Sequence, residues 1–283
     1  MGKANETHTP KPVAVDDGRQ AREALVLYRR EGRCVRLTLN RPGRGNSLVP
    51  EFVEAFRQAL VQARDESPDL LLIDAAGKAF SSGGDIAGFL RHADTVAGLE
   101  AYASTLVGSL NAAILDLMAF PAPVLVGVQG PVTGGSLGFL LASDIVVMSE
   151  AAFVQPYYAE VGFAPDGGWT AMLPRRIGEA RALEIQLLNR RVDAWRAHAL
   201  GLASSVAAAD EFQQMLAQHV ETLLAKAGGT LAATRALIRG PQRQAEIARM
   251  LEAERELFVE RVALPEVVDR MRRFDARSAK DNR

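Results

Sequence analysis

The stretch VTGGSLGFLLASD, residues 132–144, places a glycine-rich turn directly before an apolar helical run, and it can be interpreted in two ways. In the first, GGSLG matches the G-x-S-x-G pattern of serine hydrolases and Ser136 is a nucleophile. In the second, the glycines act through their backbone N–H groups at a helix start, and Ser136 has no chemical role. A nucleophile elbow needs a strand that runs directly into the first glycine. The strand expected here ends at Gly130 and is followed by Pro131, which disfavours further strand pairing.

A serine hydrolase also needs an acid and a histidine. Asp166 with either His198 or His219 would follow the chain order Ser…Asp…His. Both histidines lie in helical patterns, however, where a histidine is more often structural than catalytic. The context therefore favours the glycines over Ser136 as the working groups.

A second loop of the same design occurs earlier in the chain. KAFSSGGD (78–85) follows the apolar run DLLLIDAAG (69–77), just as the first loop follows PAPVLVGVQG (121–130). Short apolar runs of this kind are typical of strands buried on both faces of a sheet. One such loop could be only a tight turn. Two loops after two core strands instead favour a pair of converging N–H donors, which would form an oxyanion hole.

Strands and helices alternate along most of the chain. Residues 24–42 predict a hairpin with its turn at REGR, and Ser47 and Pro50 open an amphipathic helix. A long helical stretch covers 95–118, and IVVMS (145–149) is strand-like. The alternation continues to about residue 206 and predicts the α/β class.

The pattern changes near residue 210, after which only helices are expected. The C-terminal stretches either form a solvated amphipathic bundle or act as an oligomerisation element, and the sequence leaves both possibilities open. The expected helices cover 210–226, 230–239, 241–262 and 265–275. The expected organisation is a disordered N-terminal tail (1–23), an α/β core (24–209) and a C-terminal helical region (210–283).

The composition argues against several classes of protein. The 283-residue chain is 48% hydrophobic with a net charge of −1, so no basic field indicates a nucleic-acid partner. A lone cysteine, Cys34, cannot form an internal disulfide, and the four histidines lack the spacing of metal ligands. Apolar runs such as 122–128 and 137–142 are too short to span a membrane, and residues 1–20 do not resemble a signal peptide. We therefore expect a cytoplasmic enzyme with no metal, no nucleic-acid partner and no membrane association.

Four segments together resemble the crotonase superfamily, the enoyl-CoA hydratase/isomerase family, in their order and spacing. The resemblance implies a spiral of ββα units followed by C-terminal helices that build homotrimers or hexamers. It also implies an acyl-CoA thioester substrate and no metal or redox cofactor, because coenzyme A is part of the substrate. The segments are LNRPGRGNSL (39–48), GKAFSSGGDI (77–86), PVLVGVQGPVTGGSLGFLLASDIVV (123–147) and GFAPDGGWTAMLPRRIG (162–178).

The resemblance also assigns roles to the two glycine loops. Gly84 in SSGGDI and Gly135 in TGGSLG match the residues whose N–H groups form the oxyanion hole of the family. Negative charge builds up on the carbonyl oxygen during chemistry next to a thioester, and preorganised amide donors stabilise it. The loss of one such donor typically costs about 2.7–4 kcal/mol.

The sequence departs from the family pattern at both acids of the hydratases. Gly138 stands where the first glutamate is expected, and Tyr157 stands where the second is expected. Asp166 in VGFAPDGG instead resembles the single carboxylate of the Δ3,Δ2-enoyl-CoA isomerases and of the ring-opening isomerases of phenylacetate breakdown. The resemblance therefore implies a shift of a C=C bond through a dienolate, with Asp166 as acid and base.

Asp166 needs a raised pKa for this role, because an ordinary aspartate is a weak base with a pKa of about 3.9. Neighbouring Phe163, Pro165 and Trp169 could supply an apolar setting. An alternative role for Asp166 is the N-cap of a helix formed by the residues that follow it. The alternative activities are a hydratase, or a related lyase or hydrolase, with a non-standard acid and base. A non-catalytic acyl-CoA-binding scaffold also remains open.

Four further residues are candidates for the site. Glu160 is a second candidate for the catalytic carboxylate because it lies close to Asp166 in the sequence. Tyr157 and Tyr158 could bind the acyl group, and Arg44 could contact a CoA phosphate, although aromatic packing and simple solvation are the alternatives. Two further acids at family positions, Asp85 and Asp144, are expected to be structural.

Overall fold

The computed structural model describes residues 24–281, so the predicted disordered tail over 1–23 lies outside the described residues. The strands are Val26–Glu31 (β1), Cys34–Leu39 (β2), Leu70–Ala75 (β3), Val124–Val128 (β4), Val132–Thr133 (β5), Ile145–Ser149 (β6), Phe153–Gln155 (β7), Val192–Asp193 (β8) and Ser205–Ala207 (β9). They form a six-stranded sheet in the order β1-β2-β3-β4-β6-β9 and a small sheet in the order β5-β7-β8. In the large sheet β1 and β2 are antiparallel, as the hairpin prediction requires, and all other neighbours are parallel.

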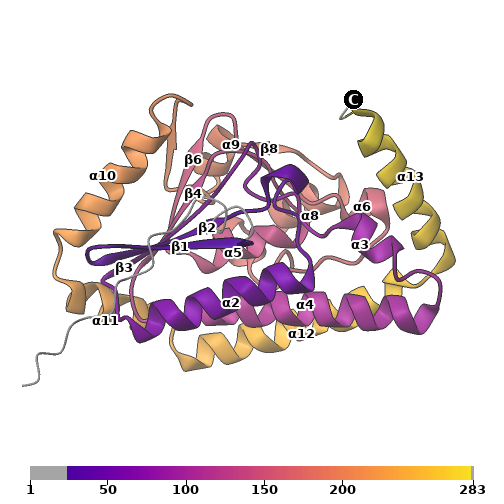
Figure 1. Ribbon diagram of the computed structural model, residues 1–283, viewed down its shortest axis with the longest axis horizontal. Coiled ribbons are helices and arrows are strands. Elements are labelled where there is room, and N and C mark those ends of the chain that lie inside the picture. The colour runs from indigo at the N-terminus through magenta and orange to yellow at the C-terminus, as the bar shows by residue number, and fades with distance from the viewer. Residues whose placement is uncertain (1–23, 282–283) are drawn as a thin grey trace, which may run out of the picture.

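Helices surround the large sheet (Figure 1). They are Pro50–Asp65 (α2), Ile86–Leu90 (α3), Val96–Met118 (α4), Leu137–Ala142 (α5), Tyr158–Val161 (α6), Leu173–Ile177 (α7), Glu179–Leu187 (α8), Ala194–Ala199 (α9), Phe212–Leu224 (α10), Gly228–Ile238 (α11), Pro241–Val262 (α12) and Pro265–Asp281 (α13), with 3-10 turns at Pro42–Arg44 (η1) and Gly134–Ser136 (η2). The expected helix near Ser47 begins at Pro50, and its N-cap residue is Val49, so Ser47 does not open it. The Ser47 hydroxyl instead accepts a hydrogen bond from Arg41 at 2.6 Å.

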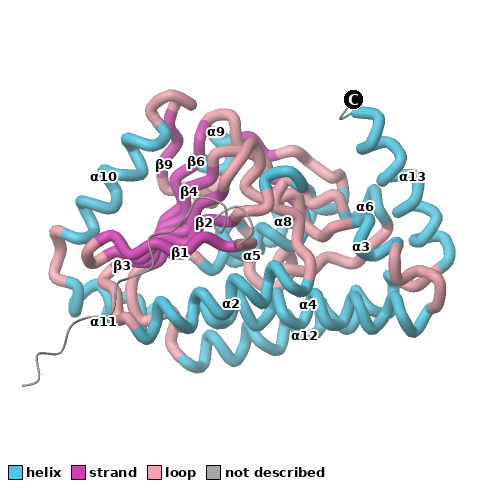
Figure 2. The backbone as a smooth tube through the Cα atoms, in the orientation of Figure 1, coloured by secondary structure: helices cyan, strands magenta, loops and turns pink. Residues whose placement is uncertain are grey.

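The chain winds as a spiral, as the family resemblance predicts. Each turn adds one strand to the large sheet, whose strands are seen together in Figure 2, and then a short extended segment to the small second layer. After β4 the second segment is β5, and after β6 it is β7. After β2 and β3 the second segments are shorter and are joined by the isolated bridges Leu48–Gly84 and Ser81–Val132. The prediction of an α/β spiral of ββα units is thereby confirmed.

Both faces of the large sheet are buried, which explains the continuous apolar runs in the sequence. On β3, Leu71 and Ile73 face the main core, whereas Leu70 and Leu72 belong to a second cluster on the opposite face. Phe212 and Leu216 of α10 cover that second face. The buried, two-sided strand predicted at residues 69–77 is therefore confirmed.

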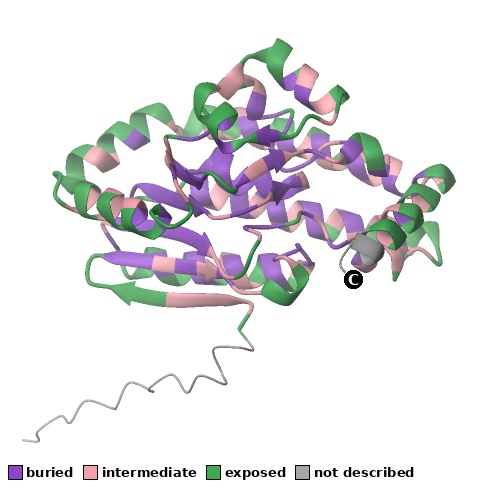
Figure 3. Cartoon of the chain, turned by 90° about the horizontal axis from the view of Figure 1, so that it is seen from above, coloured by how far each residue is buried: buried purple, intermediate pink, exposed green. Residues whose placement is uncertain are grey.

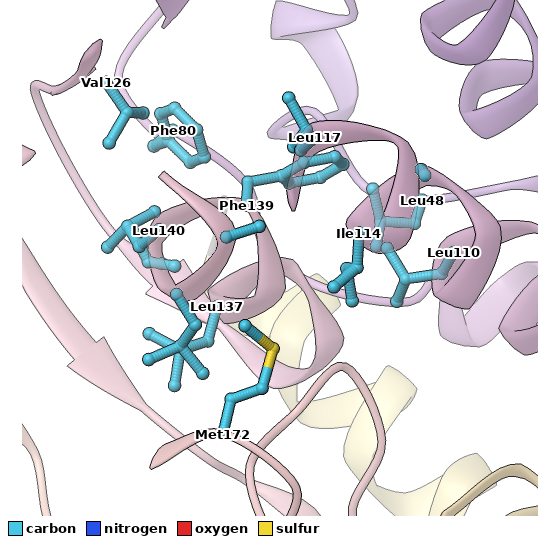
Figure 4. Packing of buried hydrophobic residues seen from close by; sticks show 14 of the residues in the cluster. Leu48, Phe80, Leu110, Ile114, Leu117, Val126, Leu137, Phe139, Leu140 and Met172 are labelled. Atoms are coloured by element: carbon cyan, nitrogen blue, oxygen red, sulfur yellow. The ribbon is translucent and has the colours of Figure 1, made fainter. Parts of the chain in front are cut away.

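Helix α5, the helical part of residues 132–144, lies at the centre of the molecule. Every residue of α5 is buried, and Figure 4 shows its side chains packed among those of strands and other helices. The Phe139 ring meets the edges of Phe56 and Phe80 at centroid separations of 4.9 and 6.5 Å. This packing anchors the glycine turn that precedes α5.

All four predicted C-terminal helices are present, as α10 to α13. Helix α12 runs along α4, as Figure 1 shows, and α4 also packs against α2. One face of α12 is buried in the same core as the strands, through residues that include Leu251, Phe258 and Val262, while its other face is exposed. Figure 3 shows this contrast for the molecule as a whole, with buried residues in the central strands and exposed residues on the outer helices. The C-terminal region therefore completes the hydrophobic core of this chain.

Helix α4 differs from the expectation that no segment is apolar enough to cross a membrane. Among the described residues it is the one helix with the length and composition for a span, and half of its apolar window is buried inside the fold. Its contacts with α2, α5 and α12 are those of a core helix.

A buried ionic cluster ties α11 to the core. Arg235 is 8% exposed and donates to Asp144 at 2.7 Å, and also to the carbonyl oxygens of Leu117 and Met118 at the end of α4. Arg239 pairs with the same Asp144 at 2.9 Å. The structural role expected for Asp144 is thus observed.

We expect Arg235→Ala to lower the free energy of unfolding by about 3 kcal/mol, because it removes a donor from buried carbonyl groups at the end of α4 and leaves Asp144 with one partner fewer. Arg272→Ala is the matched control, since Arg272 and Asp269 form a pair whose side chains are both more than 60% exposed. Such a surface pair contributes about 0–1 kcal/mol. Urea denaturation of both variants at one protein concentration checks the difference, and equal losses would contradict it.

Candidate active site

The two glycine loops predicted from the sequence lie against each other. Their backbones are joined by hydrogen bonds from Ser81 N to Pro131 O (3.1 Å) and from Thr133 N to Ser81 O (3.0 Å). The approach is so close that a Cβ atom on Gly83, whose φ is +76°, would lie 2.7 Å from the Thr133 oxygen. Glycine is required here both for space and for the left-handed conformation.

Gly84 and Gly135 line one cavity of about 980 Å³, Gly84 from the first loop and Gly135 from the second. In the parallel bridge to Leu48 the hydrogen bonds use Gly83 O and Asp85 N, so the N–H of Gly84 faces away from Leu48. The structure therefore brings together the two residues predicted to form the oxyanion hole.

Asp166 lies in the same cavity, beside Gly135. It is 7% exposed, and a Cβ atom built on Gly135 would lie 2.8–2.9 Å from its two carboxyl oxygens. The Tyr158 hydroxyl donates a 2.5 Å hydrogen bond to Asp166 Oδ1. Asp166 is thus a buried carboxyl group held by a tyrosine and directed at the second glycine loop.

Burial raises the pKa of Asp166 from 3.8 to about 7. The hydrogen bond from Tyr158 acts in the opposite direction, and the negative charge of Glu254 raises the pKa further. At neutral pH a substantial fraction of Asp166 is therefore ionised while its conjugate acid is also present. A group in this state can both remove and return a proton.

Asp166 does not cap a helix. The helix after it, α7, starts only at Leu173, and its N-cap residue is Met172. The alternative role considered for Asp166 is therefore not the one observed.

The nucleophile interpretation of Ser136 has no structural support. Ser136 is fully buried in η2, and its hydroxyl lies 2.7 Å from the Thr133 carbonyl oxygen and 3.2 Å from that of Ser81. His198 contacts the carbonyl of Ala203, and His219 contacts Ser205. The two histidines that could have served as a base thus make their contacts elsewhere in the fold.

Tyr157 and Tyr158 both line the cavity, but in different ways. Tyr157 adopts a left-handed backbone conformation with φ +62°, and its ring meets the edge of Phe274 at 5.7 Å. Tyr158 is buried and its hydroxyl hydrogen is used on Asp166, which indicates a positioning contact. Substrate contact by either tyrosine stays a prediction.

Arg44 lies in η1, lines the cavity and is 54% exposed. Its guanidinium pairs with Asp85 at 3.2 Å, and Arg41 pairs with the same carboxylate at 3.0 Å. These cations and the N–H of Gly88 hold the pKa of Asp85 below its usual range, although burial acts in the opposite direction. Asp85 is thus the N-cap of α3, as its expected structural role requires, and Arg44 stands at the edge of the cavity.

Glu160 is not brought to this cavity. It is exposed on α6 and lines a separate hollow with Arg270, Arg273, Ala276 and Arg277. The turn at Tyr157 directs Tyr158 and Val161 of the same helix into the cavity, which leaves Glu160 on the outer side. The choice of Glu160 as a second catalytic carboxylate is therefore corrected: its position in the fold does not allow it to act with Asp166.

A carboxylate cannot be accommodated at Gly138 in this packing. A Cβ atom there would lie 2.4 Å from Ile114 Cδ1 and 2.9 Å from the carbonyl oxygen of Gly167. The packing of the core around α5 therefore leaves no room for a side chain at the position of the first hydratase acid.

Among the described residues no cluster of three or more potential metal ligands occurs.

One residue that the sequence analysis missed contacts the Asp166 loop from α12. Glu254 is 5% exposed and accepts hydrogen bonds from the backbone N–H groups of Gly168, Thr170 and Ala171 at 2.7–2.9 Å. A signal was available, since Glu254 falls among the spaced buried positions of α12 between Leu251 and Phe258. A carboxylate on the apolar face of a helix requires a buried partner.

The raised pKa of Asp166 predicts a specific dependence of stability on pH. The folded protein holds the Asp166 proton more tightly than the unfolded chain does, so stability should fall as the pH rises from about 4 to 7. The shift from 3.8 to about 7 corresponds to a loss of up to about 4 kcal/mol. Asp166→Asn lacks this titration, and urea denaturation of both proteins across this range should show the wild type losing more. Parallel curves would contradict the assignment.

Comparison with known proteins agrees with this geometry. The family model described as enoyl-CoA hydratase/isomerase matches residues 29–278. A probable enoyl-CoA hydratase, EchA12, of Mycobacterium tuberculosis is 37% identical over 172 residues, which cover 59% of this chain and 60% of that protein. The 1,2-epoxyphenylacetyl-CoA isomerase of Escherichia coli is 32% identical over 203 residues, or 70% of this chain and 76% of that protein.

Solved structures show the same similarity. The crystal structure of an enoyl-CoA hydratase from Mycobacterium avium subsp. paratuberculosis superposes with a TM-score of 0.80 at 28% identity and covers 90% of this chain and 96% of that one. The match to the family model takes in most of the chain and includes both glycine loops, Asp166 and Glu254. The chain therefore belongs to the enoyl-CoA hydratase/isomerase family of the crotonase superfamily.

Proposed function

We propose that this protein is an acyl-CoA isomerase that shifts a C=C bond of an enoyl-CoA, with Asp166 as its single acid and base. The observation that carries the proposal is the position of the buried Asp166 carboxyl group, which lies against Gly135 in the cavity that Gly84 also lines. The relatives include proteins named as hydratases and as isomerases, so the choice between these activities depends on the residues of this site.

In the proposed mechanism the thioester carbonyl oxygen accepts hydrogen bonds from the N–H groups of Gly84 and Gly135. Asp166 removes a proton from the carbon next to the thioester, and the resulting dienolate carries its charge on that oxygen. Asp166 then delivers the same proton two carbons further along the chain. No bond to water is formed and no carbon is oxidised or reduced overall, so this reaction needs no redox cofactor.

The residues around Asp166 support one proton carrier rather than two. Gly138 and Tyr157 stand where hydratases have their glutamates, and neither provides a carboxylate. The Tyr158 hydroxyl fixes one carboxyl oxygen at 2.5 Å, which leaves the other available to the substrate. A hydratase would need a second acid to deliver a proton while the first activates water.

Three aromatic side chains in the wall of the cavity favour binding of an apolar acyl group. Phe89, Phe163 and Phe258 line the cavity, and their ring centroids are 4.9–5.9 Å apart. Arg44, with its side chain about half exposed, is the proposed contact for a CoA phosphate. The proposal also includes a homotrimer or hexamer, which the family resemblance implies. A cytoplasmic location follows from the composition, and independence of metal ions follows from the spacing of the histidines and from the resemblance.

We expect Asp166→Asn to lower kcat for conversion of a 3-enoyl-CoA to its 2-enoyl isomer by about 10²–10⁴-fold, because general acid–base catalysis contributes about that much. Binding of the CoA ester should change little. Glu160→Gln is the matched control, since Glu160 lies in a separate hollow.

Steady-state kinetics, with product mass measured by mass spectrometry, tests both the residue and the reaction. Unchanged turnover in Asp166→Asn would exclude Asp166 as the catalyst. A product heavier by one water would identify a hydratase. Tight binding without turnover across a panel of acyl-CoA esters would identify a scaffold.

A further inference from the structure

Glu254 occupies an unusual place for a carboxylate. It lies in the middle of α12 on the buried face of the helix, and only 5% of it is exposed. Its Oε2 accepts from Gly168 N at 2.8 Å, and its Oε1 accepts from Ala171 N at 2.9 Å and from both the N–H and the hydroxyl of Thr170 at 2.7 Å. Four donors from one short segment therefore converge on a single side chain that comes from a distant part of the sequence.

The segment that Glu254 holds directly follows Asp166. Within it, Gly167 packs so closely on the second glycine loop that a Cβ atom there would lie 2.2 Å from Gly135 O. Trp169 donates from its ring N–H to Gly134 O at 2.7 Å. The contacts of Glu254, Gly167 and Trp169 thus hold the segment after Asp166 against the second glycine loop.

Glu254 also places a charge close to Asp166. Four donated hydrogen bonds favour the ionised carboxylate, because a protonated carboxyl group would need an acceptor for its own hydrogen. Burial is the larger influence and leaves the pKa of Glu254 raised above its usual value, although these hydrogen bonds act to lower it. Around Asp166 the facing titratable groups are Tyr158 of α6 and Glu254 of α12. The other charged residues that line the cavity are Lys78, Asp275 and the paired Arg44 and Asp85.

We propose that Glu254 is a positioning residue for Asp166: it ties the segment after Asp166 to α12 and keeps a fixed negative charge beside the Asp166 carboxyl group. The charge disfavours a second negative charge nearby, so it adds to the larger effect of burial in raising the pKa of Asp166. The C-terminal region thereby takes part in setting the acid–base properties of the site. This inference adds to the proposed function and uses the role of Asp166 stated there.

The test is Glu254→Gln, which preserves the shape of the side chain and removes its charge. The pKa of Asp166, read from its side-chain ¹³C carboxyl signal and assigned with Asp166→Asn, should fall by about one pH unit. Amide exchange at Gly168, Thr170 and Ala171 should accelerate about tenfold or more, because an amide side chain cannot accept from all of these donors. Glu256→Gln is the matched control on the exposed side of α12 and should change neither quantity.

A folded Glu254→Gln protein with the wild-type pKa of Asp166 and wild-type amide exchange would overturn the proposal. If this variant does not fold, Glu254→Asp is tested in its place. The shorter side chain keeps the charge but moves the carboxylate away from the three backbone amides. Faster exchange at those amides would support the positioning role, and unchanged exchange would refute it. Both readouts are independent of turnover, so failure of the isomerase proposal would appear separately, as full activity in Asp166→Asn.

Discussion

Hydrogen bonds between the backbones of Ser81, Pro131 and Thr133 join the two glycine loops, and the geometry of the cavity depends on this contact. It is possible only because no side chain separates the loops at Gly83, or at Gly167 where the Asp166 segment packs on Gly135. The two glycine loops and the segment after Asp166, which come from distant parts of the chain, thus pack together as one unit. Amide donors held in such a unit stabilise a developing charge without reorganising, which is the condition for effective oxyanion stabilisation.

The two buried carboxylates of the site divide two tasks between them. The amide groups that follow Asp166 need an acceptor, and Glu254 supplies it from α12. Because Glu254 satisfies those donors, the Asp166 side chain does not have to cap the segment and can face the cavity. The arrangement separates support of the loop from the proposed proton transfer, although a single aspartate at this position could have served either purpose.

Much of the fold follows from the sequence because its signals are local. The continuous burial of β3, the hairpin of β1 and β2 and the four C-terminal helices each depend on patterns within a few residues. Gly84 and Gly135 were placed in one cavity because two similar loops follow neighbouring parallel strands, whose ends lie at one edge of the sheet. These features need no knowledge of distant contacts.

The errors arose where the direction of a side chain depends on tertiary structure. Glu160 lies six residues before Asp166, but the left-handed turn at Tyr157 directs Glu160 away from the cavity. Glu254 was overlooked because its partners lie more than eighty residues earlier, and its helix resembles an ordinary amphipathic one. A charged residue on the apolar face of α12 was the available indication.

Helix α13 also belongs to the cavity: its Phe274 and Asp275 line the wall, and the Phe274 ring packs on Tyr157. The last helix of the described chain is therefore part of the wall of this cavity. Proteolytic cleavage between α12 and α13 would therefore open the cavity while leaving the core sheet and both glycine loops in place. A fusion partner that displaces α13 would have the same effect.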